Sequence, residues 1–233
     1  MSGRVIAIAG AKGSPGCSFL AVAIARCLSA NMISTLLLDG DAEGGGVGSL
    51  LDANIAIPAR AADGRASAER QVCIEERLRF AEVGQTVDGP INGFELVDAE
   101  RSRHQSVVVD LGHSTGVLQR QLSAASDWLL WVIVPDRSGL ERADKALESG
   151  VLGAANVGLV FNRIGPGRLN RAEEVLSGRH QLPVIARINE DRRLSERLSQ
   201  GLPIHREGAL RGTLRELIRS IHPESWTAVS AWR

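Results

Sequence analysis

A glycine-rich segment near the N-terminus has residue types that suit phosphate binding. Residues 11–19 read AKGSPGCSF, between the apolar run RVIAIAG and the helical apolar pattern LAVAIARCL. A glycine-rich turn that opens a helix presents backbone N–H groups and the positive end of the helix dipole to an anion. Gly13 and Gly16 supply the permissive backbone, and Ser18 offers a hydroxyl to Mg²⁺. A standard phosphate loop ends in G-K-[ST], however, and here Cys17 stands where the lysine is expected.

Three aspartates follow apolar runs that have the composition of buried strands. Asp39 and Asp41 end the run LLLDGD, and Asp110 ends the run SVVVD. Side chains at i and i+2 on a strand point to the same side, so Asp39 and Asp41 would repel each other unless a cation or a donor lies between them. This favours a ligand-facing pair. A second interpretation stays open for Asp39 and Asp110, because an aspartate after a strand often caps the following turn.

Short apolar runs alternate with longer amphipathic stretches along the chain. Runs without in/out alternation suit strands that are covered on both faces, and strand followed by helix, repeated, predicts a doubly wound α/β fold with a mostly parallel sheet. The expected strands are residues 5–11, 34–41, 106–112, 128–135, 156–163 and 183–189. The expected helices are residues 16–30, 69–80, 115–125, 137–149, 168–178, 190–200 and 207–221.

The chain length of 233 residues lies within the range of one α/β domain. We expect a single domain over residues 1–222, followed by a tail of residues 223–233. Residues 54–104 are the least informative part, because they contain glycine and proline breaks and little periodicity beyond one helical stretch.

Composition narrows the classes of function. Lys+Arg and Asp+Glu both number 27, so the net charge gives no global argument for nucleic acid or for an acidic membrane. Cys17, Cys27 and Cys73 form no CxxC pair, which argues against a zinc site and a disulfide framework. No apolar stretch approaches the ~20 residues that span a bilayer, and the N-terminus lacks a signal-peptide pattern. We therefore expect a cytoplasmic protein.

The segment KGSPGCS at residues 12–18 resembles the deviant Walker A motif K-G-G-x-G-K-[ST] of the MinD/ParA class of P-loop ATPases. In that class the first lysine reaches the partner's phosphates across a nucleotide-sandwich dimer, and the second holds the β and γ phosphates of its own nucleotide. Lys12 matches the first lysine, and Cys17 replaces the second. Lys145 is the only other lysine in the chain, so chance is a poor explanation for Lys12 at this position. The resemblance implies a homodimer that binds ATP or ADP with Mg²⁺.

Later segments resemble further landmarks of this class in the expected order. LLLDGDAEGGG resembles the D-x-D end of the second strand, which implies that Asp41 orients the attacking water, with Asp39 beside it. SVVVDLGHS resembles the Walker B strand, which implies that Asp110 holds the hydration shell of Mg²⁺. LVFNRIGPG resembles a later Asn-Arg pair whose asparagine, Asn162, would read adenine, although an asparagine after a strand is often a turn residue. The resemblance implies nucleotide contacts at Gly13, Ser14, Pro15, Gly16, Cys17, Ser18, Phe19, Asn162 and Arg163, magnesium contacts at Ser18 and Asp110, and catalytic roles for Lys12, Asp39 and Asp41.

The cysteine at position 17 is expected to weaken this site. Phosphoryl transfer in P-loop proteins depends on positioned positive charge, which a neutral thiol does not supply. A charge-assisted hydrogen bond is worth ~1.5–3 kcal/mol, so we expect nucleotide affinity to fall roughly tenfold to a hundredfold. Two interpretations of the thiol stay open, a redox-sensitive group at a helix N-terminus and, more commonly, a small buried apolar residue.

The C-terminal region has a second amphipathic pattern. Leucines and isoleucines recur at helical spacing over residues 209–221, with arginines opposite, which predicts a helix packed on the domain. Arginines together with Trp226 and Trp232 also suit a peripheral membrane contact through residues 209–232. The arginines of residues 190–200 could touch DNA, but the acidic residues beside them favour ordinary pairing within a helix.

These patterns predict a MinD/ParA-like nucleotide-binding protein with a degenerate phosphate loop. Its divergent loop resembles those of CpaE/TadZ-like and septum-site-determining-like members, which implies a spatial organiser or scaffold that meets a protein partner in a pilus, secretion or cell-division system. Two alternatives stay open. One is an active, slow ATPase that cycles on a membrane or nucleoid, and the other is an interaction module that no longer binds nucleotide.

Overall fold

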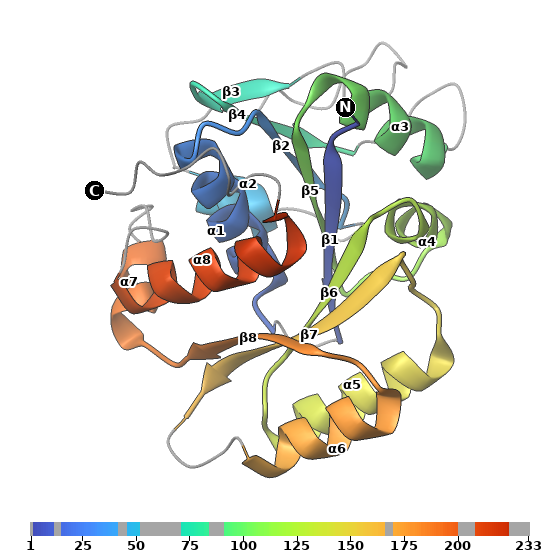
Figure 1. The fold of residues 1–233 in the computed structure, drawn as a ribbon, viewed down its shortest axis with the longest axis vertical. Coiled ribbons are helices and arrows are strands. Elements are labelled where there is room, and N and C mark those ends of the chain that lie inside the picture. Colours follow the sequence, from blue (N-terminus) through green and yellow to red (C-terminus); the bar gives the residue numbers. More distant parts are fainter. Residues whose placement is uncertain are drawn as a thin grey trace.

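A mostly parallel sheet organises the chain, with its first strand between the two halves. The computed structural model describes residues 2–11, 15–41, 46–51, 71–83, 91–165, 170–199 and 208–223. Within these residues eight strands form one sheet in the order β3-β4-β2-β5-β1-β6-β7-β8. The pair β3 and β4 is antiparallel, and the other neighbouring pairs are parallel. Figure 1 shows β1 running through the middle of the sheet from the labelled N-terminus. The predicted doubly wound α/β fold is confirmed.

The boundaries agree with the predicted elements to within a few residues, except in the region 69–103 and at residues 46–50, where the structure has a short helix that the sequence did not predict. The strands are β1 (Arg4–Gly10), β2 (Thr35–Asp39), β3 (Val72–Glu75), β4 (Leu78–Glu82), β5 (Ser106–Gly112), β6 (Trp128–Ile133), β7 (Asn156–Ile164) and β8 (Val184–Asn189). The helices are α1 (Cys17–Ala30), α2 (Gly46–Leu50), α3 (Gly93–Arg103), α4 (Val117–Ala124), α5 (Arg137–Ser149), α6 (Asn170–His180), α7 (Arg192–Ser199) and α8 (Gly208–Ile221).

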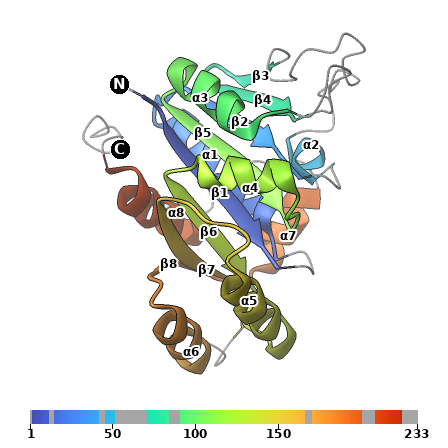
Figure 2. The same cartoon turned by 90° about the vertical axis from the view of Figure 1, so that its right-hand side faces the viewer.

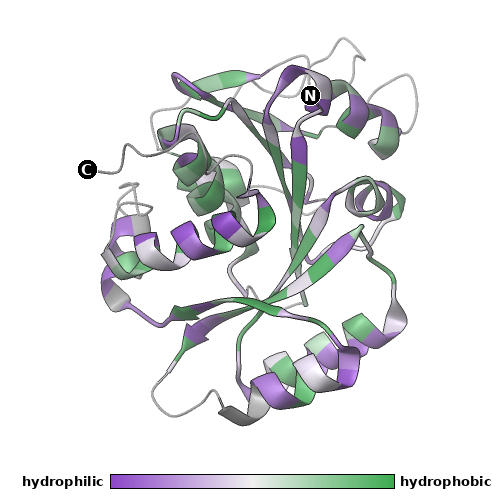
Figure 3. Cartoon of the chain, viewed as in Figure 1, coloured by the Kyte–Doolittle hydropathy of each residue, from purple (hydrophilic) through white to green (hydrophobic). Residues whose placement is uncertain are grey.

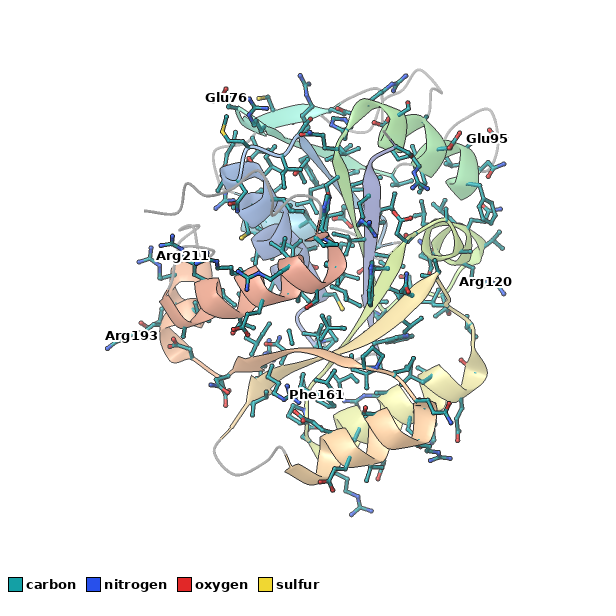
Figure 4. The ribbon with its side chains drawn as sticks, viewed as in Figure 1. Glu76, Glu95, Arg120, Phe161, Arg193 and Arg211 are labelled. Atoms are coloured by element: carbon teal, nitrogen blue, oxygen red, sulfur yellow. The ribbon has the colours of Figure 1, made fainter. Side chains whose placement is uncertain are left out.

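Helices cover both faces of the sheet, as the continuous apolar strands require. Helices α1, α2, α7 and α8 share with one face a core cluster that includes Leu20 and Leu214. Helices α3 to α6 share a second cluster that includes Leu122 and Phe161, and Figure 4 labels Phe161 on β7. Figure 2 shows α3 and α4 in front of the sheet and α8 behind it. The sheet is therefore buried on both sides, and its strand ends are the places where polar groups can meet.

The predicted helix over residues 69–80 is wrong, because this stretch contains the hairpin β3-β4. In β4, Leu78 and Phe80 are buried and Arg79 between them is exposed, which is the period of two that a strand requires. β4 pairs with β2 along its whole length. A few apolar residues in a short segment fit either period, and here the open edge of β2 selects the strand.

Helix α3 begins in the region that the sequence left open. Asn92 is its N-cap, and the side-chain oxygen accepts hydrogen bonds from the N–H groups of Phe94 (3.0 Å) and Glu95 (3.4 Å). Glu95 returns a contact, because its Oε1 accepts from Nδ2 of Asn92 at 3.0 Å. Asn92 therefore caps the start of α3 and is itself held by Glu95, and the spacing Asn-x-x-Glu was the available signal in the sequence.

Helix α8 packs on the domain. Its apolar residues Leu210, Leu214, Leu217, Ile218 and Ile221 are all buried, and they join the core cluster that contains α1. Figure 3 shows hydrophilic residues on the outer helices α6 and α8. The prediction of a terminal helix packed on the domain is confirmed. The division into residues 1–222 and a tail of residues 223–233 stays a prediction, since residues 224–233 lie outside the described part of the chain.

No helix among the described residues is long and apolar enough to cross a bilayer. The three cysteines are free thiols, with Cys17 and Cys27 buried and Cys73 exposed.

Candidate functional site

The candidate site lies at the carboxyl ends of the central strands. β1 has β5 on one side and β6 on the other, so the order of strands reverses direction at β1. In open α/β sheets, ligands bind outside the carboxyl ends of the strands at such a switch point. The loop after β1, the end of β2, the end of β5 and the end of β7 all contribute predicted residues here.

The start of α1 forms the described part of the predicted phosphate loop. Gly16 is the N-cap of α1, with a left-handed backbone (φ 99°), and no side-chain hydrogen bond caps the described helix start. The first N–H groups of a helix lack intrahelical partners, so this terminus suits an anion. Lys12, Gly13 and Ser14 lie outside the described residues, and their roles stay predictions.

Cys17, the first residue of α1, is buried at 4% exposure. Burial raises the pKa of its thiol well above the ordinary value, and the negative charges of Asp110 and Asp41 raise it further. The thiol is therefore neutral in the folded protein. Of the two interpretations left open by the sequence, the reactive thiol with a lowered pKa is wrong, because desolvation and two nearby carboxylates outweigh the helix terminus.

Asp39 and Asp110 end the neighbouring strands β2 and β5 and lie in register with each other. Asp110 is fully buried and Asp39 is 4% exposed. The Oδ1 atoms accept backbone hydrogen bonds, Asp39 from Asp41 N at 3.2 Å and Asp110 from Gly112 N at 3.0 Å. Both Oδ2 atoms are buried without a hydrogen-bond partner among the described residues. Two buried carboxylates with free oxygens form an electronegative site.

The titration of this pair reflects its burial. Burial and then the charge of Asp110 raise the pKa of Asp39 to about 7. Burial also raises the pKa of Asp110, whereas the Ser18 hydroxyl and the Gly112 N–H stabilise its charged form. A neighbouring cation would stabilise both carboxylates in their charged form and so oppose the upward shifts of their pKa values. Ser18 thus lies beside Asp110, as the predicted magnesium pair requires.

Asp41 is held against the segment that follows β5. Its Oδ1 accepts a hydrogen bond of 2.6 Å from Ser114 Oγ. Gly112 has φ 57°, and a Cβ atom there would lie 2.1 Å from Asp41 Oδ2. A side chain at position 112 would therefore collide with the carboxylate, and glycine is required for both the backbone angle and the space. The hydrogen bond between Ser114 and Asp41 therefore joins the segments that follow β5 and β2.

The sequence did not indicate Ser114 or Gln119, which both support the β2 end. Gln119 is 4% exposed, and its Nε2 donates to Gly40 O at 2.7 Å. Ser114 lies four residues after Asp110 in the segment SVVVDLGHS. Its hydroxyl near a strand-ending aspartate could have marked it in the sequence. Gln119 carried no signal of its own, because its contact joins positions 79 residues apart.

Asn162, Arg163 and Phe19 occupy three different environments. Asn162 ends up beside the phosphate loop, 5% exposed, and donates from Nδ2 to Pro15 O at 2.7 Å. Arg163 is exposed, with φ 55°. Phe19 is partly buried and packs against the core cluster on the α1 side of the sheet. The structure therefore brings Asn162 to the loop and turns Phe19 toward the core, and the nucleotide contacts of all three stay predictions.

The residues present fit a divalent cation bound together with phosphate. Mg²⁺ in proteins uses one or two carboxylates, water and substrate phosphate oxygens. Asp110 offers an unpartnered buried oxygen, and Ser18 offers a hydroxyl beside it. No group of three or more His, Cys, Asp or Glu side chains in the described ranges forms a cage by itself. The donor set therefore matches an ion that is shared between protein and phosphate.

Comparisons with known proteins agree with this chemistry. Residues 6–204 match the family model of the CobQ/CobB/MinD/ParA nucleotide binding domain. An uncharacterised protein of Mycobacterium tuberculosis, present in strains CDC 1551 and H37Rv, is 31% identical over 233 residues. The alignment covers 93% of this chain and 63% of that protein, so the chain spans less than two thirds of its relative's length.

Two solved structures share the fold. The septum site-determining protein MinD of Pyrococcus horikoshii OT3, complexed with Mg-ADP, has a TM-score of 0.74 at 19% identity, covering 97% of this chain and 99% of that one. A ParA family ATPase from Chlorobium tepidum TLS has a TM-score of 0.75 at 20% identity, covering 95% and 99%.

Proposed function

Because this chain belongs to the CobQ/CobB/MinD/ParA family of nucleotide-binding domains, we propose that it binds ATP or ADP with Mg²⁺ in a degenerate phosphate loop and acts as a spatial organiser or scaffold. The proposed setting is a pilus, secretion or cell-division system, where bound nucleotide favours a homodimer that a protein partner recognises. The septum site-determining role in the name of the P. horikoshii relative supports the division setting.

The observation that carries this proposal is the neutral, buried thiol of Cys17. It occupies the loop position where the resemblance expects a lysine, and it lies near the carboxylates of Asp110 and Asp41. A lysine there would place a permanent positive charge between these acids and the phosphates, whereas the thiol places none. Fast hydrolysis depends on such a charge, so the proposed protein responds to bound nucleotide and turns it over slowly or not at all.

The acidic end of the sheet supports retained nucleotide binding. Asp39 and Asp110 keep buried oxygens without partners among the described residues, which costs folding free energy unless a ligand uses them. Mg²⁺ bound at Ser18 and Asp110 would supply the positive charge that the loop lacks. In this arrangement the backbone N–H groups at the start of α1 bind the anion, and Asp110 with Ser18 holds the cation.

Calorimetric titration of ATP and ADP, each with Mg²⁺, tests the proposal on the wild type, Lys12→Ala and Cys17→Lys. Cys17→Ser is the matched control, because it keeps a small neutral side chain. We expect measurable wild-type binding, weaker binding by Lys12→Ala, unchanged binding by Cys17→Ser, and an affinity roughly tenfold to a hundredfold higher in Cys17→Lys. No binding by the wild type with binding restored in Cys17→Lys would instead support an interaction module that has lost its ligand.

A turnover assay separates the proposed scaffold from an active ATPase. Mg²⁺-dependent phosphate release by the wild type that disappears in Asp41→Ala would favour the slow, cycling ATPase. Sedimentation of the wild type with and without nucleotide tests the proposed homodimer, which should gain population with ATP.

The proposed location is the cytoplasm. Because the apolar face of α8 is buried against the domain, a peripheral membrane contact would have to come from other residues within 209–232. Binding to vesicles rich in anionic lipid, with and without ATP, is the measurement that decides it.

A further inference from the structure

A buried amide joins the end of β7 to the phosphate loop. Asn162 Nδ2 donates to Pro15 O at 2.7 Å, across 147 positions of sequence, and the contact is buried. The other end of the amide is also engaged, since Asn162 Oδ1 accepts from Arg163 N at 2.9 Å. These two bonds fix the orientation of the amide group, because a flipped amide would face a carbonyl with its oxygen and an N–H with its nitrogen.

The backbone on both sides of this contact adopts left-handed angles. Gly16 has φ 99°, and a Cβ atom there would lie 2.4 Å from Asn162 Nδ2. Arg163 has φ 55°, which is uncommon for a residue with a side chain. The hydrogen bond from Arg163 N to Asn162 Oδ1 fixes the Asn162 side chain relative to the peptide bond that follows it. The Asn162 side chain therefore contacts both the start of α1 and the end of β7.

The geometry points to Asn162 as a positioning residue for the phosphate loop rather than a reader of the nucleotide base. A loop without its lysine depends on backbone N–H groups, and their directions are set by the conformation that Pro15 and Gly16 adopt. Asn162 holds that conformation in advance of binding, so phosphate meets donors that need little rearrangement. This inference rests on the proposed nucleotide binding, and it assigns Asn162 to the phosphates, whereas the family resemblance assigns it to adenine.

The two assignments predict different affinities for a phosphate ligand that has no base when Asn162 is substituted. The probes are Mg²⁺-ATP and Mg²⁺ with inorganic tripolyphosphate. Two variants remove the N–H donors: Asn162→Asp keeps the side-chain shape, and Asn162→Leu adds no negative charge beside the phosphates, so an effect of positioning must appear in both. We expect both ligands to lose affinity by the same factor, about tenfold. Weaker ATP binding with unchanged tripolyphosphate binding would overturn the inference and restore the base-reading role.

Asn156→Asp is the matched control. Asn156 lies at the other end of β7, is exposed, and donates from Nδ2 to Asp127 O at 3.0 Å. The two substitutions therefore remove the same kind of bond from the same strand. Unchanged affinity for both ligands in Asn156→Asp is expected, and a loss equal to that of Asn162→Asp would show a general effect of disturbing β7 and overturn the assignment to the loop.

A measurement on the unliganded protein keeps this inference separate from the proposed function. Backbone order parameters of Gly16, Cys17 and Ser18 should fall from the rigid value of about 0.85 toward about 0.6 in Asn162→Asp, while those of the sheet stay unchanged. If the wild type binds neither probe, the proposed function fails, and these order parameters still decide whether Asn162 positions the loop. Unchanged values at the three positions, or lower values throughout the domain, would overturn the inference.

Discussion

The two ends of the central sheet both bury carboxylates, but they treat them differently. At the amino end, Glu100 is 1% exposed and accepts hydrogen bonds from Gln71 Nε2 at 2.8 Å and Arg103 NH1 at 3.3 Å, with His104 Nε2 at 3.5 Å. At the carboxyl end, Asp39 and Asp110 are equally buried and each keeps an oxygen without a partner among the described residues. Side chains of the protein satisfy the carboxylate of Glu100, whereas the free oxygens of Asp39 and Asp110 would be satisfied by a bound ligand.

This difference teaches which buried charges serve the fold and which serve binding. A buried carboxylate without partners costs free energy, so a chain under selection for stability alone supplies donors, as it does for Glu100. At the carboxyl end, burial and the charge of Asp110 raise the pKa of Asp39, and the one N–H that Asp39 accepts, from Asp41, does not offset them. Perturbed acids at a strand-end switch point are typical of functional sites.

The largest expected effect on stability comes from substituting Glu100, at the amino end of the sheet. Glu100→Ala should lower the free energy of unfolding by about 3 kcal/mol, because it leaves Gln71, Arg103 and His104 without their shared acceptor. Asp98→Ala, at an exposed position of the same helix, is the control and should change stability by less than about 0.5 kcal/mol. Urea unfolding provides both values, and equal effects in the two variants would remove the contrast between the ends.

Asp39→Asn should raise the free energy of unfolding, whereas Glu100→Ala lowers it. Burial and the charge of Asp110 raise the folded-state pKa of Asp39 from its ordinary value of 3.8 to about 7, so the folded state binds the proton more tightly than the unfolded state. Its charged form therefore destabilises the fold increasingly as the pH rises between these values. We expect Asn to raise the free energy of unfolding of the unliganded protein by about 2 kcal/mol near pH ~8 and by almost nothing near pH ~3, below the ordinary pKa. A pH-independent difference would contradict this account.

Mg²⁺ without nucleotide should stabilise the carboxyl end of the sheet, by a smaller free energy than the two substitutions change. A ligand that binds only the folded state raises stability, by about 1 kcal/mol at roughly ten times its dissociation constant. Thermal unfolding of the wild type should therefore shift upward with added Mg²⁺, and that of Asp110→Asn should not. The same shift in both proteins would place the ion elsewhere.

Ser114→Ala should have the smallest effect. It removes the 2.6 Å hydrogen bond to Asp41 Oδ1 at a partly exposed position, which is worth about 0.5–1 kcal/mol. Ser114→Thr keeps the hydroxyl and should retain wild-type stability. Denaturant midpoints of the two variants check this, and a loss in Thr equal to that in Ala would point to the space around position 114 instead of the bond.

Most of the fold could be predicted because its signals are local. β1, β5 and β7 are apolar runs flanked by helical patterns, and their boundaries match the prediction to within about one residue. The hairpin β3-β4 could not be told from a helix by its few apolar residues, because its conformation is selected by pairing with β2. Helix α3 had a readable capping signature at Asn92 and Glu95 that the hydrophobic periodicity did not reveal.

The sequence by itself determined the strand-end aspartates, the glycine-rich loop and the cysteine within it, because each of these is a residue type at a fixed local spacing. Tertiary structure decided what surrounds them. The neutral state of Cys17 comes from burial and from two carboxylates at or just after the ends of other strands, and the hydrogen bond from Asn162 to Pro15 joins residues 147 positions apart. Desolvation and long-range hydrogen bonds arise only when distant segments meet, so no local pattern encodes them.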